Sequence, residues 1–452
     1  MAATKAFETG FYQPMSEKLE TPPKQTAKTA KERPGIRLRD ILGPGLITGA
    51  SDDDPSGIAT YSQAGAQFGY GLGWTMVLTY PLMSAVQMIS ARIGRASGRG
   101  IAGNLRCHYP RWLTTLLVLL LLTANTINIG ADLGAMADAT ALVTGLPSAI
   151  FLLLFAAFCA GAEVILPYAK YARILKWLTL ALFAYVITLF LVKVSWGEAL
   201  TGLVVPKVKL NAEAITMIVA IFGTTISPYL FFWQASEEAE EVENHDDRHP
   251  LRRAPEEGES ELKRIELDTL AGMAASNLVA LAIILTTAAT LHVSGITDIN
   301  TSADAAEALR PVAGPYASLI FALGIVGTGL LAVPVLAGSA AYGIGEALGR
   351  PVGLDRKPRK AKAFYATIIV ATGIGALMNF SPINPIKALF WAAVINGIVA
   401  VPVMAVMMLL STKTAIMGRF TVHGPLRFAG WLATAAMAAA ATAMGISLFG
   451  AA

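Results

Sequence analysis

Residues 43–57 read Gly-Pro-Gly-Leu-Ile-Thr-Gly-Ala-Ser-Asp-Asp-Asp-Pro-Ser-Gly, and this stretch decides the fold. Three consecutive carboxylates, Asp52 to Asp54, lie about halfway along an apolar run, 41–66, that is long enough to cross a bilayer. Each carboxylate at the centre of a lipid-facing helix costs about 3 kcal/mol even on a lenient insertion scale. Pro55 removes a backbone donor, and Gly57 adds conformational freedom. We therefore predict a broken helix whose carboxylates line a hydrated cavity.

A surface turn between two shorter helices is the alternative interpretation, with Asp54 as a helix N-cap. It divides 41–66 into two runs that are each too short to cross a membrane. It also reverses the alternation of loop charges further along the chain. The intramembrane break is therefore the favoured prediction.

A second interruption lies in the apolar run 213–235, where Gly223, Thr224, Thr225, Ser227 and Pro228 follow one another closely. A simple proline kink with a back-bonded serine is the alternative there. The two interrupted spans are the first and the sixth, so they stand five apart. Because five is odd, a five-plus-five duplication must be inverted across the membrane. Paired interruptions in two halves indicate a transport site, and unwound carbonyls with carboxylates suit hard cations.

Composition supports an all-α polytopic membrane protein. The chain is 54% hydrophobic and 15% charged, with a mean hydropathy of +0.56, whereas soluble domains carry about 25% charged residues. Apolar runs predict eleven transmembrane helices, and the third and eighth are long enough to require tilt. The predicted spans are 41–66, 72–94, 113–143, 148–167, 174–195, 213–235, 268–293, 315–346, 363–380, 383–410 and 428–450.

Loop charges orient these spans by the positive-inside rule. The N-terminal tail and every second loop are rich in Lys and Arg, and the loop 196–212, with Lys207 and Lys209, is the exception. We therefore expect a multi-pass inner (plasma) membrane protein with a cytoplasmic N-terminus and an external C-terminus. The basic groups are Arg33, Arg37 and Arg39; Arg92, Arg95, Arg99 and Arg106; Lys170, Arg173 and Lys176; Arg350, Arg356, Lys357 and Lys360; and Lys413, Arg419 and Arg427.

The expected organisation has four parts. Residues 1–38 are polar and lack an apolar core, which predicts a disordered cytoplasmic tail and not a signal peptide. Residues 39–210 form repeat one with helices 1–5, and 211–411 form repeat two with helices 6–10 and a cytoplasmic loop at 237–264. Residues 412–452 carry helix 11. The acidic run from Glu237 to Glu241 is interpreted as part of the solvated loop, with attraction of cations as the alternative.

The motifs at the two breaks resemble those of the Nramp family of divalent metal transporters, which has the LeuT-like inverted-repeat fold. The resemblance covers roughly 40–450. The matching stretches are Gly43-Pro44, Asp54-Pro55-Ser56-Gly57, Gly65-Ala-Gln-Phe-Gly-Tyr70, Gln87 with Ala91-Arg-Ile-Gly94 and Gly98-Arg99, Ala131-Asp132-Leu133, Gly223-Thr-Thr-Ile-Ser-Pro-Tyr229, Asp268, Asn277 and Ile416-Met-Gly418.

The resemblance implies a metal site, with several departures. The family's metal-binding Asp is kept as Asp54, whereas its Asn ligand falls on Gly57 and its methionine ligand on Ser227. The span-six carbonyl ligand would come from Thr224. The histidine that follows the proline is Tyr229 here. In span three the family's acidic pattern reads Asn125, Asp132 and Ala135, which leaves Asp132 as the titratable group of a possible proton pathway.

The implied ligands are all oxygen: Asp54, the Ser227 hydroxyl, carbonyls near Thr224, and Asp53 as a further candidate. Without the soft thioether such a site suits Mg²⁺ or Mn²⁺, and the sequence leaves these two ions open. The pattern looks like the Nramp-related, magnesium-type branch that lacks the methionine. We expect Asp52, Tyr229 and Asn396 to surround the ligands or act in gating, and we expect uptake driven by the membrane potential without proton coupling.

Other classes are weighed against this prediction. The chain shows no nucleophile–base constellation and no cofactor motif, so we expect neither an enzyme nor a bound cofactor, with the metal ion as substrate. The net charge of +4 is set by loop residues and does not indicate a nucleic-acid partner. The expected partners are the metal cation and the lipid bilayer, and the expected state is a monomer. The alternatives are a transporter of an organic cation, a proton-coupled transition-metal symporter, and a membrane enzyme or sensor.

Overall fold

A computed structural model describes residues 44–165, 182–244 and 248–449. Contacts divide the chain into Met1–Leu38 and Arg39–Ala452, and the fold described below belongs to the second unit. The regular elements of the described ranges are helices throughout. The predicted tail 1–38 and the basic loop around Lys170 lie outside the described residues, as do His245, Asp246 and Asp247.

Both predicted helix breaks are present. The first span consists of α1, Pro44–Asp52, and α2, Pro55–Phe68. The sixth span consists of α10, Ala212–Thr225, and α11, Pro228–Glu243. Each second half begins with a proline in its first turn, where the missing N–H costs nothing because the first amides of a helix have no partner within it. Proline thus ends one half-helix and starts the next.

The other long helices match the predicted spans to within a few residues, except where a span includes residues outside the described ranges or where a helix extends beyond its span. α8 covers the described end of the fifth predicted span, and α12 begins ten residues before the seventh. These helices are α3 Trp74–Ser97, α5 Arg111–Thr144, α6 Ser148–Ile165, α8 Phe183–Leu191, α12 Gly258–Thr287, α15 Ala317–Leu348, α16 Lys362–Met378, α17 Pro385–Ser411 and α19 Gly424–Phe449.

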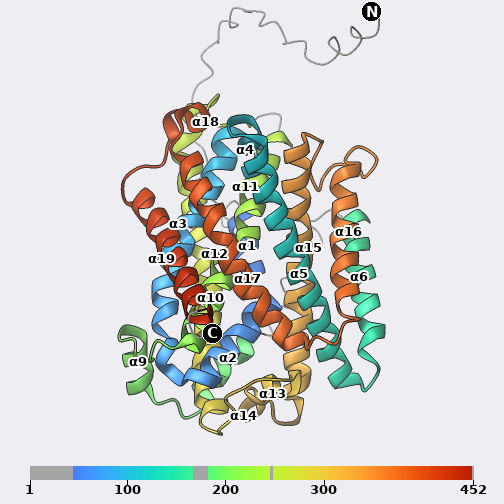
Figure 1. Ribbon diagram of the computed structural model, residues 1–452, viewed down its shortest axis with the longest axis vertical. Coiled ribbons are helices and arrows are strands. Elements are labelled where there is room, and N and C mark those ends of the chain that lie inside the picture. The colour runs from blue at the N-terminus through green and yellow to red at the C-terminus, as the bar shows by residue number, and fades with distance from the viewer. Residues whose placement is uncertain (1–43, 166–181, 245–247, 450–452) are drawn as a thin grey trace, which may run out of the picture. The chain divides into compact units, whose positions relative to one another are not determined.

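Short elements connect the long helices. The short α-helices are α4 Ile101–His108, α9 Trp196–Val204, α13 Ser302–Glu307, α14 Arg310–Ala313 and α18 Thr414–Met417. The 3₁₀ turns are η2 Gly69–Leu72, η4 Pro255–Glu257, η6 Gly314–Tyr316 and η7 Gly418–Phe420, and η5 Ala288–His292 is a π turn. In Figure 1, α4 and α18 lie at one end of the molecule, and α9, α13 and α14 lie at the opposite end.

Within the described residues, seven helical stretches are long and apolar enough to cross a membrane, and a bent pair at Pro55–Ser97 gives an eighth. α16, with 17 residues, is shorter than these spans. The number of eleven spans therefore stays a prediction.

The broken sixth span lies in the interior of the bundle. In its most apolar stretch of 18 residues, 94% of the residues are buried, whereas in the corresponding stretches of α6 and α19 only 22% are buried. The outer helices instead expose large apolar side chains, among them Leu153 and Leu154 on α6 and Leu432 and Ile446 on α19. This is the pattern of peripheral helices facing lipid around a protein-lined centre.

Close helix contacts are made at glycines. An ideal Cβ at Gly49 of α1 would lie 2.4 Å from the Gly272 carbonyl carbon of α12, and one at Gly223 of α10 would lie 2.0 Å from the Ala393 oxygen of α17. A side chain at either position would force the backbones apart. Both half-helices that lead into the breaks are therefore held against a neighbouring helix at backbone distance.

The predicted loop at 237–264 is wrong for much of its length, because α11 continues to Glu243 and α12 begins at Gly258. Glu238 is fully buried and forms a 2.6 Å ion pair with Arg264 of α12. Buried Arg95 of α3 binds Glu257 and Glu261 at 2.9 and 3.1 Å. The acidic run is thus the end of a helix that pairs with Arg264 and is not a solvated loop, which sequence charge alone did not reveal.

Candidate metal site

The first break is buried. α1 ends at Asp52, the chain is non-helical at Asp53 and Asp54, and these three side chains are 0%, 6% and 1% exposed, respectively. Asp54 is the N-cap of α2, and its Oδ1 accepts hydrogen bonds from the Gly57 amide and the Ser56 hydroxyl, both at 2.7 Å. Asp54 therefore does cap a helix, but the alternative of a surface turn is wrong, because the cap lies inside the protein.

The second break places a serine hydroxyl beside the last carbonyl groups of a half-helix. α10 ends at Thr225, and Ser227 takes an extended conformation ahead of α11. The Ser227 hydroxyl donates to the carbonyl oxygens of Gly223 and Thr224, at 2.6 and 2.9 Å. The hydroxyl oxygen keeps lone pairs that these donated bonds do not use. Ser227 therefore both fixes the end of α10 and offers an oxygen at the break.

The two breaks meet in space. An ideal Cβ at Gly57 would lie 3.1 Å from Thr224 Oγ1, and the Tyr229 hydroxyl donates to the Ser51 carbonyl oxygen at 3.0 Å. The sequence prediction that 52–57 and 224–228 lie together is confirmed. Since residue 57 has no side chain, the hydroxyl of Thr224 approaches the backbone of the first break closely.

A third element, α5, completes this side of the site through Asn128. Its amide nitrogen donates to Asp54 Oδ2 at 3.0 Å and to Asp132 Oδ2 at 3.2 Å, and its oxygen accepts from Asn396 of α17 at 3.2 Å. Asp132 Oδ1 and Asn396 Oδ1 are buried without hydrogen-bond partners among the described residues. Asn128 therefore links three of the sequence-predicted residues.

The sequence analysis missed Asn128. Asn128 stands four residues before Asp132 on the third predicted span, which places both on one face of the helix. That spacing could have indicated that Asn128 lies beside Asp132 at the site. Asn125, which the sequence analysis did consider, bonds instead to the Leu336 carbonyl at 2.8 Å and the Ser339 hydroxyl at 2.7 Å on α15.

The neighbouring carboxylates of the first break point to different helices. Ser276 Oγ of α12 lies 2.6 Å from Asp52 Oδ2 and 3.1 Å from Asp53 Oδ1, whereas Asp54 contacts α5. Across the described part of the chain, no three His, Cys, Asp or Glu side chains gather where they could hold one metal ion. A metal at Asp54 would therefore depend on hydroxyl, amide, carbonyl and water oxygens for its other ligands.

The site is rich in buried carboxyl groups. Asp52, Asp53, Asp54 and Asp132 are all buried, and none of them forms an ion pair with Lys, Arg or His in the described ranges. Uncompensated buried carboxylates are strongly destabilising. Carboxylate, hydroxyl and amide oxygens are ligands for hard cations such as Mg²⁺, Ca²⁺ and Mn²⁺. The arrangement is suited to a divalent cation.

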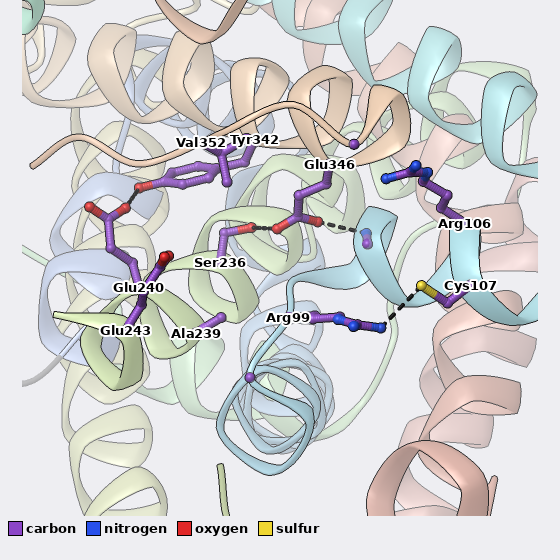
Figure 2. A pocket seen from close by; sticks show the side chains of 13 residues that line it. Arg99, Arg106, Cys107, Ser236, Ala239, Glu240, Glu243, Tyr342, Glu346 and Val352 are labelled. Atoms are coloured by element: carbon purple, nitrogen blue, oxygen red, sulfur yellow. Dashed lines mark hydrogen bonds between the residues drawn. The ribbon is translucent and has the colours of Figure 1, made fainter. Parts of the chain in front are cut away.

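A separate polar pocket of about 210 Å³ lies where α4, α11 and α15 meet (Figure 2). Glu346 accepts bonds from the Gly100 and Gly103 amides at 3.1 and 2.8 Å and from the Ser236 hydroxyl at 3.2 Å. Glu240 accepts a hydrogen bond from the Tyr342 hydroxyl. These carboxylates join three helices through donors of the protein itself. The sequence analysis did not predict this pocket.

Across the described ranges, helices alone form the regular structure, and two broken, buried helices meet beside buried carboxyl groups, which is the arrangement of the LeuT-like fold. The chain belongs to the Nramp family, since the family model described as "Natural resistance-associated macrophage protein-like" matches residues 45–447. This confirms the resemblance found from the motifs at the breaks.

Curated relatives extend the likeness. The divalent metal cation transporter MntH of Chromohalobacter salexigens is 28% identical over 302 residues, which cover 64% of this chain and 66% of the relative. MntH of Burkholderia ambifaria is 26% identical over 431 residues, 91% of this chain and 90% of the relative. Both are described as transporters and not as enzymes.

Solved structures support the fold. A crystal structure of the manganese transporter of Eremococcus coleocola has a TM-score of 0.72 and 16% identity, and the match covers 93% of this chain and 91% of that one. MhsT in complex with L-phenylalanine has a TM-score of 0.58 and 14% identity, covering 90% and 98% of the two chains. At these identities the likeness establishes the architecture alone.

Proposed function

We propose that this protein imports a divalent metal cation, Mg²⁺ or Mn²⁺, through an oxygen-lined site between its two broken helices. The observation that carries the proposal is Asp54, a buried carboxylate that lies where both breaks meet and has no cationic side chain paired with it in the described ranges. The names of the relatives, "divalent metal cation transporter" and "manganese transporter", support the same substrate class.

The proposed ligands are the Asp54 carboxylate, the Ser227 hydroxyl and oxygens of Thr224. The Thr224 hydroxyl faces Gly57, the position that matches the family's Asn ligand, so we assign it the role of that missing side chain. Ser227 offers a hard oxygen where the family pattern has the softer methionine, and Thr224 offers one beside the position of the family's Asn ligand. Mg²⁺ fits such a site because it keeps several waters, and Mn²⁺ accepts the same oxygen ligands.

Alternating access accounts for movement of the ion. The site residues are at most 6% exposed, so an ion could enter or leave only after the helices around the site move. Opening would proceed by movement of α1 and α11, the half-helices on one side of the two breaks, relative to the helices around them. In this proposal the protein works as a monomer in the plasma membrane, with a cytoplasmic N-terminus and an external C-terminus.

Proton-coupled transport is the second candidate. It is favoured by Asp132, which connects to Asp54 through Asn128 and retains a buried oxygen without a partner in the described ranges. Against it stands Tyr229, which replaces the histidine of the family pattern and donates its hydrogen to a backbone carbonyl. We therefore prefer uptake that is driven by the membrane potential.

Uptake into proteoliposomes tests the proposal. Purified protein should accumulate Mg²⁺ or Mn²⁺, Asp54→Asn should abolish uptake, and internal pH should stay constant. Asp138→Asn is the matched control, because Asp138 is on α5 as well but bonds to Ser302, not to the site. Normal uptake by correctly folded Asp54→Asn protein would refute the proposed site, and absence of divalent-cation uptake by the wild type would refute the function.

A further inference from the structure

We propose that Asp52 and Asp53, together with Ser276 of α12, form a second divalent-cation site beside the one at Asp54. This proposal rests on the proposed function and adds to it the number of ions that the protein holds. The two sites share the non-helical backbone of the first break and contact different helices, α5 at Asp54 and α12 at Asp52 and Asp53.

The first argument is hydrogen bonding. Ser276 has one hydroxyl hydrogen, yet its oxygen lies 2.6 Å from Asp52 Oδ2 and 3.1 Å from Asp53 Oδ1. Asp52 is 0% exposed, and its Oδ1 has no hydrogen-bond partner in the described part of the chain. Two carboxylates thus share one donor and keep an acceptor oxygen that the protein leaves unsatisfied. A bound cation would use that oxygen and the Ser276 lone pairs.

The second argument is charge. α1 ends at Asp52, so its last carbonyls and the negative end of its dipole lie at the same point as these carboxylates. A divalent ion at Asp54 would lie beside Asp54 and Asp132, which Asn128 links. The buried carboxyl groups of Asp52 and Asp53 instead contact Ser276 and are left to a second ion. Two carboxylates with a hydroxyl and carbonyls form a hard, doubly negative site, which suits Mg²⁺ or Mn²⁺.

The third argument is that packing fixes the position of Ser276. α1 and α12 are joined at three successive levels: the Gly45 amide donates to Asp268 Oδ2 at 2.7 Å, Gly49 packs on Gly272, and Asp52 meets Ser276. The two close-packed levels hold α12 beside the last turn of α1. Ser276 is therefore presented to both carboxylates by rigid helices, as a preorganised ligand requires.

Counting bound Mn²⁺ tests the proposal. In equilibrium dialysis of the purified full-length protein with Mn²⁺ alone, the wild type should bind two ions at saturation. The double variant Asp52→Asn/Asp53→Asn should bind one, and Asp54→Asn should also bind one. Electron paramagnetic resonance should show spin–spin coupling between two Mn²⁺ ions in the wild type and the isolated six-line spectrum in each variant. Ser276→Ala should weaken the second binding step about tenfold or more.

Asp268→Asn is the matched control. It removes a buried carboxylate from the same α1–α12 contact, two turns from Ser276, and should leave two bound ions. One bound ion in the wild type, or two in the double variant, would overturn the second site while leaving transport through Asp54 intact. Loss of one ion in Asp268→Asn as well would also overturn it, since the effect would then be structural. Failure of the wild type to transport Mg²⁺ or Mn²⁺ would instead overturn the proposed function.

Discussion

At the scale of single residues, Asn128 orders the site. A carboxylate that ligates a metal needs a fixed orientation, and neighbouring hydrogen bonds supply it. Asn128 provides one donor to Asp54 and another to Asp132, while Asn396 fixes its amide from α17. One side chain thus connects the first break to two further helices.

Asn128→Ala should raise the KM for metal uptake by about 10- to 100-fold while the protein stays folded, because Asp54 loses an orienting bond. Initial uptake rates over a range of Mn²⁺ concentrations measure this change. Asn125→Ala is the control, since Asn125 lies on the same helix but bonds to α15. An equal rise in KM in both variants would assign the effect to general disturbance of α5.

In the proposed metal site, Ser227 would replace a soft sulfur ligand with a hard oxygen. Ser227→Met introduces a soft thioether at the second break, so Cd²⁺ should compete with Mn²⁺ at least about tenfold more effectively than in the wild type. Ser227→Ala separates the effect of the sulfur from loss of the bonds to the Gly223 and Thr224 carbonyls. Unchanged Cd²⁺ competition in a folded Ser227→Met variant would remove Ser227 from the ligand set.

At the scale of helices, the contact between α1 and α12 requires glycine. Gly49→Ala places a methyl group 2.4 Å from the Gly272 carbonyl carbon and should destabilise the protein by about 1–3 kcal/mol. Thermal unfolding in detergent measures the loss. Gly161→Ala on α6 has nothing within 4 Å of the added methyl group and should be neutral or slightly stabilising. A stable Gly49→Ala protein would mean that α1 moves freely away from α12.

The helix breaks were predictable because their causes are local. Pro55 and Pro228 each start a half-helix, and buried carboxylates at Asp52 to Asp54 exclude a continuous lipid-facing span. The partners of those carboxylates were not predictable, because Ser276 lies 224 residues from Asp52 and meets it through packing of α1 on α12. The error at Glu237 to Glu241 has the same origin, since a run of acidic residues does not show that Arg264 is folded against it.

At the scale of the whole molecule, the buried site lies within the membrane field, so each divalent ion that enters carries two charges through the potential. An inside-negative potential of 100 mV favours inward movement of two charges by about 4.6 kcal/mol. At about 1.4 kcal/mol per factor of ten, this corresponds to an accumulation of more than about 10³-fold at equilibrium. The ratio applies to each ion separately, so it does not depend on how many ions the protein holds.

Proteoliposomes with a potassium diffusion potential should therefore accumulate Mg²⁺ or Mn²⁺ far above the external concentration, and should only equilibrate when the potential is abolished. A dye inside the vesicles should report constant pH, because Tyr229 replaces the histidine of the family pattern. Asp54→Asn vesicles, with the same potential, control for leakage. Acidification in proportion to metal uptake would show instead that Asp132 carries protons, and the protein would then be a symporter.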